Sequence, residues 1–413
     1  LSVTIGGRIT KESFYDAANT YSLKAVYRPV DWFTIRGTQG TSYRAPNLRE
    51  RFLEGTTGFR TVSDPCVVSG DARVSDPLNP TAPDSYDPTK ETRTQGTMDA
   101  CAADGVDPTS LGLGQNGTDK FTASSSAEVT TGGSTTLSEE TSVAKTYGVI
   151  FEQPFTDAFD LTLSVTRFDI EITNSISEPS ADYSISQCYS ADGNAAFCSR
   201  VGRDSNGQIS DMDGSFINAG LETSKGYDYN IYFHQELLLG DRNIDLVLDL
   251  QATQMTEALY DVLGTVDDNL GEPTIPEWRA SARLSLSYDD YSFNWMTRFI
   301  GAGEPDWVND NENGYDYGFS ANEPSCAGLY SDAAKTEPLL CRPVAQTTDY
   351  FVHDMSISWT TDDFGINVGI RNVFNEAPPL VDGSGLASNT NVPLGVGYDT
   401  LGRTPFINFK ANF

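Results

Sequence analysis

Long apolar runs are missing from this sequence: no stretch approaches the roughly 18 consecutive apolar residues that a membrane-spanning helix needs. Basic residues are also scarce, because 27 Lys and Arg stand against 58 Asp and Glu, for a net charge of -31. Such a chain has no basic footprint for phosphates, which argues against nucleic acid as a partner. Histidine occurs only at His234 and His353, and neither accompanies a G-x-S-x-G elbow or another nucleophile signature. No catalytic residue, no enzyme activity and no cofactor are therefore predicted.

Two neighbouring segments in the second half of the chain alternate strictly between apolar and polar residues. From Trp278 to Tyr288 every second residue is apolar and the residues between are Arg or Ser, and the pattern resumes after the turn YDDY. This period of two predicts strands whose two faces have different surroundings. About ten steps of roughly 3.3 Å, tilted by about 40°, rise roughly 25 Å, the height of the lipid-facing band of an outer-membrane barrel. Aromatic residues at both ends of the apolar face fit the two girdles of such a band.

The same strand pattern recurs about twelve times along the chain. We expect strands at 1–10, 20–29, 32–45, 141–154, 158–175, 223–238, 242–257, 277–288, 291–303, 347–360, 363–374 and 403–413. The opening residues LSVTIGGRIT already have the pattern of a strand and no leader peptide precedes them, so we expect the chain to be a segment of a longer precursor.

The connections between the expected strands alternate between two kinds. Short turns rich in Asp, Gly and Pro follow every second strand, and long segments follow the others. The long connections are 11–19, 46–140, 178–222, 258–276, 304–346 and 375–402. This alternation is typical of a transmembrane antiparallel β-barrel with short periplasmic turns and long extracellular loops, and a soluble sandwich has no reason for it. We predict an all-β fold in which residues 1–413 form part of one barrel domain and the C-terminus is periplasmic.

The cysteines test this topology, because all six lie in the predicted extracellular loops and two lie in each of three loops. Pairing within each loop predicts the disulfides Cys66–Cys101, Cys188–Cys198 and Cys326–Cys341, which form in the oxidising periplasm. Zinc is the rival interpretation, and no C-x-x-C spacing supports it. The longest loop, 46–140, is by its length either functional or disordered.

Two short motifs resemble a known family. Tyr43, Arg44, Ala45, Pro46, Asn47 and Leu48 resemble the aromatic-Arg-Ala-Pro pattern of TonB-dependent outer-membrane receptors, and Asn372, Val373, Phe374 and Asn375 are similar to the Asn-Leu-Phe-Asn core of their penultimate barrel strand. The aromatic C-terminus, with Ile407, Phe409 and Phe413 at alternate positions, looks like the assembly signal of outer-membrane barrels. The resemblance covers residues 34 to 413.

The resemblance implies a roughly 22-stranded barrel, of which this chain supplies the C-terminal portion, with an N-terminal plug and a TonB-contacting segment that are absent here. It also implies TonB-dependent uptake of a scarce nutrient (an iron chelate, vitamin, oligosaccharide or peptide) across the outer membrane of a Gram-negative bacterium. The expected partners are outer-membrane lipid and lipopolysaccharide, the plug and remaining strands, the TonB complex and the nutrient. A passive porin or a surface adhesin barrel is the alternative.

Candidate ligand contacts lie in the loop 304–320, where aromatic rings and polar groups stand close together in the sequence. They are Trp307, Asp310, Asn311, Tyr315 and Tyr317. The alternative is a solvated acidic loop that covers the mouth of the barrel. The run NDNENG departs from a calcium loop at Asn309 and Ser320, so no metal is predicted.

Five arginines are expected to face the lumen, because each alternates with apolar neighbours on a predicted strand. They are Arg44, Arg279, Arg283, Arg298 and Arg371. Acids such as Asp245 and Asp249 would pair with them or hold the plug. His353 shares the face of Met355, Ile357 and Trp359 and is therefore interpreted as a girdle residue.

Overall fold

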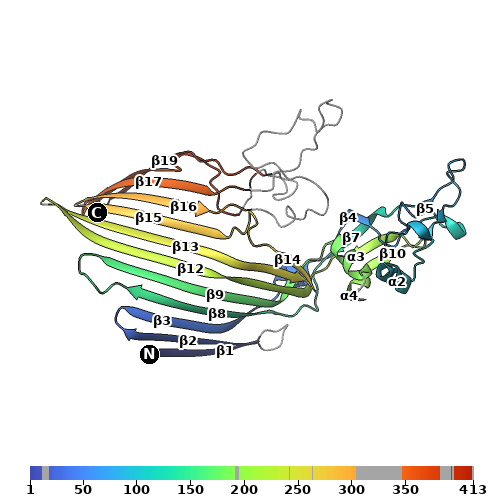
Figure 1. Ribbon diagram of the computed structural model, residues 1–413, viewed down its shortest axis with the longest axis horizontal. Helices are drawn as coiled ribbons and strands as arrows, with labels where there is room; N and C mark the ends of the chain where they lie inside the picture. Colours follow the sequence, from blue (N-terminus) through green and yellow to red (C-terminus); the bar gives the residue numbers. More distant parts are fainter. Residues whose placement is uncertain are drawn as a thin grey trace, which may run out of the picture. The chain divides into compact units, whose positions relative to one another are not determined.

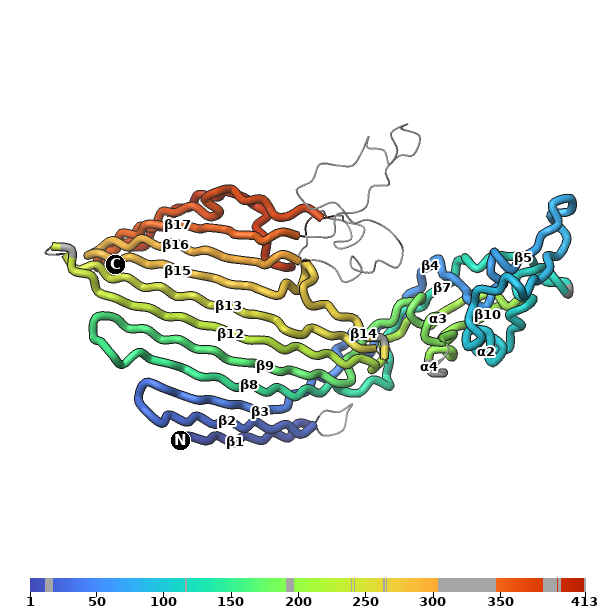
Figure 2. Tube along the Cα trace, in the orientation of Figure 1, coloured from blue at the N-terminus to red at the C-terminus, as the bar shows by residue number. Residues whose placement is uncertain are grey.

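The structure is a computed structural model that describes residues 1–11, 18–190, 195–240, 242–262, 264–303, 347–381, 392 and 395–411. The chain divides into two compact units. The first comprises Leu1–Tyr43, Thr141–Thr173 and Leu221–Phe413, and the second comprises Arg44–Glu140 and Asn174–Gly220. Figure 1 labels the elements, and Figure 2 follows the chain through them.

The first unit is built around one large antiparallel sheet whose strands follow one another in chain order (Figures 1 and 2). The strands are β1 (Ser2–Thr10), β2 (Ala18–Val30), β3 (Phe33–Arg44), β8 (Glu140–Glu152), β9 (Asp160–Ser177), β12 (Ile217–Leu239), β13 (Arg242–Val262), β15 (Trp278–Tyr288), β16 (Tyr291–Ile300), β17 (Tyr350–Thr360), β18 (Phe364–Arg371) and β19 (Thr404–Ala411). All twelve predicted strands are confirmed. β14 (Thr265–Asp268) also pairs with β13, so much of the predicted loop 258–276 is a hairpin.

Strand register separates an apolar face of this sheet from a polar face. Leu246, Leu286, Phe293, Ile357, Val368 and Ile407 stand opposite one another across six strands and form one row of the apolar face. Ile357 and Ile407 are 54% and 71% exposed. On the polar face hydroxyl groups bridge neighbouring strands, as between Thr38 and Thr146 at 2.6 Å. Apolar side chains that point outward across six strands require an apolar solvent, which lipid supplies.

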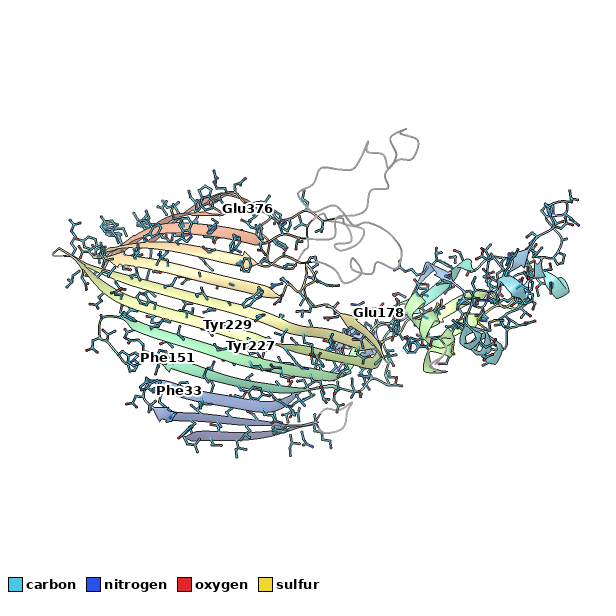
Figure 3. The ribbon with its side chains drawn as sticks, viewed as in Figure 1. Phe33, Phe151, Glu178, Tyr227, Tyr229 and Glu376 are labelled. Carbon is cyan, nitrogen blue, oxygen red and sulfur yellow. A yellow bond between two sulfur atoms is a disulfide. The ribbon has the colours of Figure 1, made fainter. Side chains whose placement is uncertain are left out.

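Aromatic rings lie along both ends of the apolar face. Tyr288, Tyr291 and Trp359 occupy neighbouring register positions at the end with short turns. At the other end Phe299 lies opposite Phe351, with ring centroids 4.7 Å apart, and Trp278 stacks on Tyr229 at 5.8 Å. Tyr229 and Tyr227 both lie on β12 (Figure 3). Among the described residues, no helix has the length and apolar character needed to cross a bilayer.

The second unit has helices and small sheets of its own. Its elements are α1 (Leu48–Phe52), β4 (Thr56–Ser63), β5 (Arg73–Val74), β6 (Ser85–Tyr86), η1 (Pro88–Lys90), α2 (Gln95–Ala103), η2 (Gln115–Gly117), β7 (Ser124–Thr131), α3 (Ala181–Tyr189), α4 (Ala195–Cys198), β10 (Val201–Arg203) and β11 (Ile209–Asp213). One sheet has the order β10-β11-β7-β4, and β5 pairs with β6. Because β11 and β7 come from different predicted loops, the two loops are parts of one fold.

A buried core with two disulfides holds the second unit together. Val62, Leu111, Ile185, Phe197 and Met212 are all nearly inaccessible and belong to one cluster that joins the two loops. The predicted disulfides Cys66–Cys101 and Cys188–Cys198 are confirmed, and all but one of their four cysteines are among the buried core residues. The predicted pair Cys326–Cys341 lies outside the described residues.

A buried ion network adds a polar link between the two loops of the second unit. Arg203 binds Asp64 at 2.5 Å and Asp104 at 3.0 Å, and the Tyr189 hydroxyl donates to Asp104 at 2.5 Å. Arg203 also lies over the Tyr189 ring, 5.2 Å from its centroid. Burial, followed by the hydrogen bond to Asp104, raises the pKa of Tyr189, so the phenol keeps its proton at neutral pH. This network could not be predicted from the sequence, because its members are separated by up to 139 residues.

Candidate functional site

The motif around Arg44 forms a structural clamp at the edge of the second unit. Arg44 donates to both carboxylate oxygens of Glu140, at 2.5 and 2.6 Å, and to Glu50 at 3.0 Å. Asn47 begins α1 by accepting from the Glu50 amide, while Glu50 accepts from the Asn47 amide, so the two residues form a capping box. Arg44 was predicted to face a lumen, and that assignment stays a prediction; the donors of its guanidinium group pair with Glu140 and Glu50.

The motif at residues 372–375 ends a strand. Asn372 and Asn375 both have positive φ, 49° and 57°, which few residues other than Gly and Asn adopt at low cost. β18 therefore stops at Arg371, three residues before the predicted end. The fully buried Asn372 side chain replaces a peptide unit: it donates to the Glu376 carbonyl at 2.8 Å and accepts from the Glu376 amide at 2.7 Å.

The other four predicted arginines lie on the polar face of the sheet, and their partners differ. Arg279 donates to the carbonyls of Val396 at 2.9 Å and Thr274 at 3.1 Å, which fastens two connections to the sheet. Arg298 lies 3.7 Å from Asp354, and Arg371 lies over the Phe406 ring. Arg283 stands opposite Asp249 in the register. The predicted ligand contacts Trp307, Asp310, Asn311, Tyr315 and Tyr317 lie outside the described residues.

His353 lies among aromatic residues on the apolar face, two positions along β17 from Phe351, and its interpretation as a girdle residue stays a prediction. Its ring lies 5.5 Å from Trp295 and 5.2 Å from Phe374, and Nδ1 is 2.9 Å from the Thr297 hydroxyl. His234 differs, because it lies on the polar face between Asp160 and Asp245, at 3.2 and 2.5 Å. Within the described part of the chain, no group of His, Cys, Asp and Glu has the geometry to hold a metal ion.

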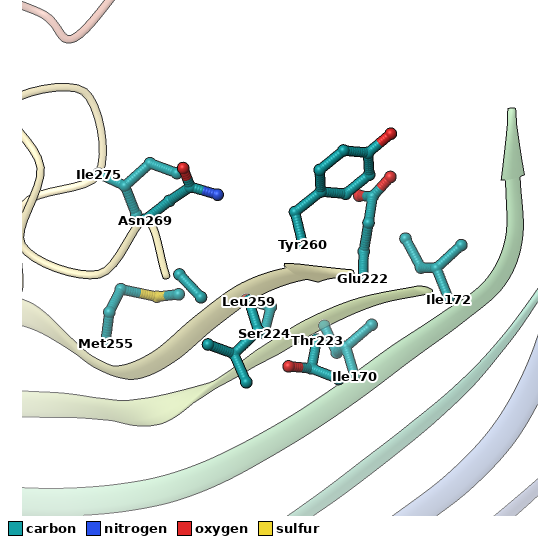
Figure 4. Close-up of a pocket in the computed structure, with 11 residues that line it drawn as sticks. Ile170, Ile172, Glu222, Thr223, Ser224, Met255, Leu259, Tyr260, Asn269 and Ile275 are labelled. Carbon is teal, nitrogen blue, oxygen red and sulfur yellow. The ribbon is translucent and has the colours of Figure 1, made fainter. Parts of the chain in front are cut away.

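A pocket of about 440 Å³ opens where β9, β12 and β13 approach the long connections (Figure 4). Six apolar residues line it together with five polar ones. The apolar residues are Ile170, Ile172, Met255, Ala258, Leu259 and Ile275, and the polar residues are Glu222, Thr223, Ser224, Tyr260 and Asn269. The mixture of an apolar body with a few polar groups is typical of a small-molecule site.

The apolar lining arises because the apolar residues of β9 lie on one face of the strand in its first half and on the other face in its second half. Leu163 and Val165 lie on the apolar face, whereas Ile170 and Ile172 have the opposite parity and lie on the polar face. The register between β8 and β9 runs from Thr162 to Thr173 without a shift, so no bulge on the β8 side causes the exchange. The change in parity of the apolar residues, from Leu163 and Val165 to Ile170 and Ile172, therefore marks the pocket in the sequence.

The pocket also depends on a close approach between three strands and on a tight turn beyond β14. A Cβ at Gly226 would overlap the Gln254 carbonyl and the Phe168 ring, so only glycine permits β9, β12 and β13 to come this close. Beyond β14 the Asn269 amide donates to the Ala258 carbonyl at 2.9 Å, and the Gly271 amide donates to the Ile275 carbonyl at 3.0 Å. This turn brings Asn269 and Ile275 over the strand ends.

The charges around the pocket are negative. Glu222 is a lining carboxylate, and none of the residues found to line the pocket is basic. The nearby Lys225 binds Glu257 at 2.8 Å, and the Thr223 hydroxyl donates to the same carboxylate at 2.7 Å. Asp261, Asp267 and Asp268 lie on the β13–β14 hairpin that borders the pocket. The pocket therefore combines an apolar body with a negative field.

The chain belongs to the TonB-dependent receptor family, because the family profile described as "TonB dependent receptor-like, beta-barrel" matches residues 1–373. Members of this family are outer-membrane β-barrels that act in transport and not as enzymes. The sheet described above is accordingly part of a barrel wall. No curated protein sequence matches the chain.

Solved structures show the same fold. A mutant of the ferric enterobactin receptor PfeA from Pseudomonas aeruginosa matches with a TM-score of 0.52 and 14% identity over 100% of this chain and 42% of the receptor. The siderophore receptor PirA from Acinetobacter baumannii matches with a TM-score of 0.52 and 14% identity over 100% of this chain and 43% of that receptor. The chain thus spans less than half the length of these receptors.

Proposed function

We propose that this chain supplies the C-terminal part of the barrel wall of a receptor that takes up a scarce nutrient across the outer membrane, driven by TonB. One observation carries the proposal: the twelve-stranded sheet, apolar on one face and polar on the other, lies almost entirely within the match to the TonB-dependent receptor barrel. The apolar face contacts lipid and lipopolysaccharide, and the polar face lines the lumen. The remaining strands and the plug complete a roughly 22-stranded barrel.

The orientation follows from the connections. Short turns join β2 to β3, β8 to β9, β15 to β16 and β17 to β18, and β19 runs toward that same end of the sheet. Periplasmic turns are short in outer-membrane barrels, so this end and the C-terminus are periplasmic. The segments 46–140 and 178–222, which form most of the second unit, are then extracellular, as are the connections near 258–276, 304–346 and 375–402. The two disulfides suit the extracellular side, where no reducing thiols open them.

In this proposal the ligand is captured at the extracellular end, and the pocket between β9, β12 and β13 is one place where the wall contacts it. Arg279, Arg283, Arg298 and Arg371 face the lumen. Of these, Arg283 and Arg371 have neither a carboxylate within ion-pair distance nor a carbonyl partner among the described contacts, so they are the arginines we assign to the plug or the ligand. A saturable receptor is required because a scarce solute cannot be concentrated by diffusion through an open pore.

Transport measurements with a deletion strain test this function. The gene that encodes this chain is deleted, and uptake of radiolabelled or fluorescent iron chelates, vitamins, oligosaccharides and peptides is measured with and without the complementing gene. Uptake of at least one nutrient class should be lost on deletion, saturable on complementation and abolished in a strain without TonB. Uptake that persists without TonB would identify a passive channel instead, and unchanged uptake across all classes would reject the transport function.

A further inference from the structure

We propose that the pocket between β9, β12 and β13 binds an amphipathic group that is neutral or positively charged and rejects anionic groups. This inference rests on the proposed uptake function for its biological meaning, and it names the chemical class that the wall pocket selects. It follows from three properties of the described lining: its size, its apolar surface and the sign of its charge.

Size and surface favour a compact apolar body. The volume of about 440 Å³ lies within the range of small-molecule pockets. Ile170, Ile172 and Met255 come from two strands, and Ile275 adds a fourth apolar side chain from the turn beyond β14 (Figure 4). A flat or branched apolar group would bury against these side chains, and the hydrophobic effect would retain it.

The polar groups decide which charge is accepted. Tyr260, Asn269, Thr223 and Ser224 offer donors and acceptors for a neutral polar group. Glu222 offers a carboxylate, and the acids of the β13–β14 hairpin add negative potential. The cation closest in sequence, Lys225, is bound by Glu257 and cannot serve an anion without breaking that pair. An anionic ligand would therefore meet the repulsion of these carboxylates, whereas an amine would be attracted by them.

The test uses three probes that share one apolar body and differ in charge: tryptamine (positive), tryptophol (neutral) and indole-3-acetate (negative). The complete gene product is purified in detergent micelles, and binding is measured by calorimetry at neutral pH. We expect tryptamine to bind at least about tenfold more tightly than indole-3-acetate, with tryptophol between them. Equal affinities, or tighter binding of the carboxylate, would overturn the inference.

Four variants test which residues of the pocket produce the charge preference and the affinity. Glu222→Gln should remove most of the preference for tryptamine over indole-3-acetate, and Glu222→Lys should reverse it. Glu171→Gln is the matched control, because Glu171 is exposed on the opposite face of β9, between Ile170 and Ile172 in the sequence, and should change nothing. Ile172→Ala should weaken all three probes about fivefold without altering their order. Heat-dependent gel mobility verifies that each variant is folded.

The outcomes separate this inference from the proposed function. If no probe binds the wild type, or if binding is insensitive to Glu222→Gln and Ile172→Ala, the pocket does not select this class, even where uptake requires TonB. If the probes show the expected order and the variant effects but no nutrient uptake requires TonB, the pocket chemistry stands and the transport proposal fails.

Discussion

The large sheet of the first unit, which forms the barrel wall, and the second unit differ in what surrounds their apolar residues. In the wall, large apolar side chains such as Val368 and Phe409 are 50% and 66% exposed, and the strands are held together by hydrogen bonds between neighbouring strands. In the second unit, Val62 and Phe197 are 2% and 1% exposed within a compact core that contains two disulfides. The same chain thus uses lipid as the partner of its apolar residues in one unit and its own side chains in the other. Variants that perturb only one of the two units test this comparison.

Loss of a disulfide should affect only the unit with the core. Replacing both Cys66 and Cys101 by Ser reopens a loop of sequence separation 35, which should lower the free energy of unfolding of the second unit by about 4 kcal/mol on the chain-entropy account. The pair Cys188 and Cys198, with a separation of 10, should cost about 3 kcal/mol. Limited proteolysis of the second unit reports its stability, and heat-dependent gel mobility reports that of the wall. A change in the mobility of the wall with an intact second unit would contradict the division.

A charge on the apolar face should affect only the wall. Leu284 lies midway along β15 on that face, so Leu284→Lys should destabilise the barrel by about 2–4 kcal/mol. Ser285→Lys is the control, because Ser285 lies on the polar face and loses only its 2.7 Å hydrogen bond to Asn294. Urea unfolding from lipid vesicles measures both variants. Equal effects would mean that the two faces do not differ in their surroundings.

Acid should weaken the second unit through Glu91. The hydrogen bonds from Arg93 lower the pKa of Glu91 from 4.5 to about 2, and Arg93 also donates to the Cys66 carbonyl at 2.8 Å. A depressed pKa in the folded state means that the stabilisation is fully present above pH 4.5 and is lost as the pH falls toward 2. Glu91→Gln should flatten this dependence and cost roughly 1.5–2 kcal/mol at neutral pH.

Protease susceptibility of the second unit, measured from pH 7 to pH 2 with an acid-stable protease at the lower end, checks this prediction. Glu128→Gln is the control, because Glu128 is an exposed side chain of β7 in the same unit. A pH dependence below 4.5 that is identical in wild type and Glu91→Gln would show that this pair does not couple the unit to pH.

The helix cap at Asn47 should give the smallest effect. Asn47→Ala removes the acceptor for the Glu50 amide and should destabilise α1 by about 1 kcal/mol, while Asn47→Ser keeps an acceptor and should be nearly neutral. Hydrogen exchange of the Glu50 amide measures the difference. Equal exchange in both variants would show that the Arg44 clamp alone holds α1 in place.

Much of the wall was predictable, because its strands need only a local pattern. Alternation around Leu284 or Ile357 follows directly from the period of two, and the pairing of Cys66 with Cys101 follows from the order of strands and loops. The fold of the second unit was not predictable, because Val62, Ile185 and Met212 meet only in three dimensions. The pocket was missed for the same reason: Ile170, Glu222 and Met255 come from three strands, and the exchange of faces on β9 was the one local sign of it.

The shared core of the second unit constrains how such a receptor can change. Its buried cluster includes Val62 and Ala127 from segment 46–140 and Ile185 and Ile209 from segment 178–222. Each of these two insertions between wall strands therefore supplies half of a hydrophobic interior. Grafting either insertion alone onto a related barrel would expose the apolar side chains of its half of the core to water. The two must be inherited, deleted or transplanted as a pair, although a complete hairpin of the wall separates them in the gene.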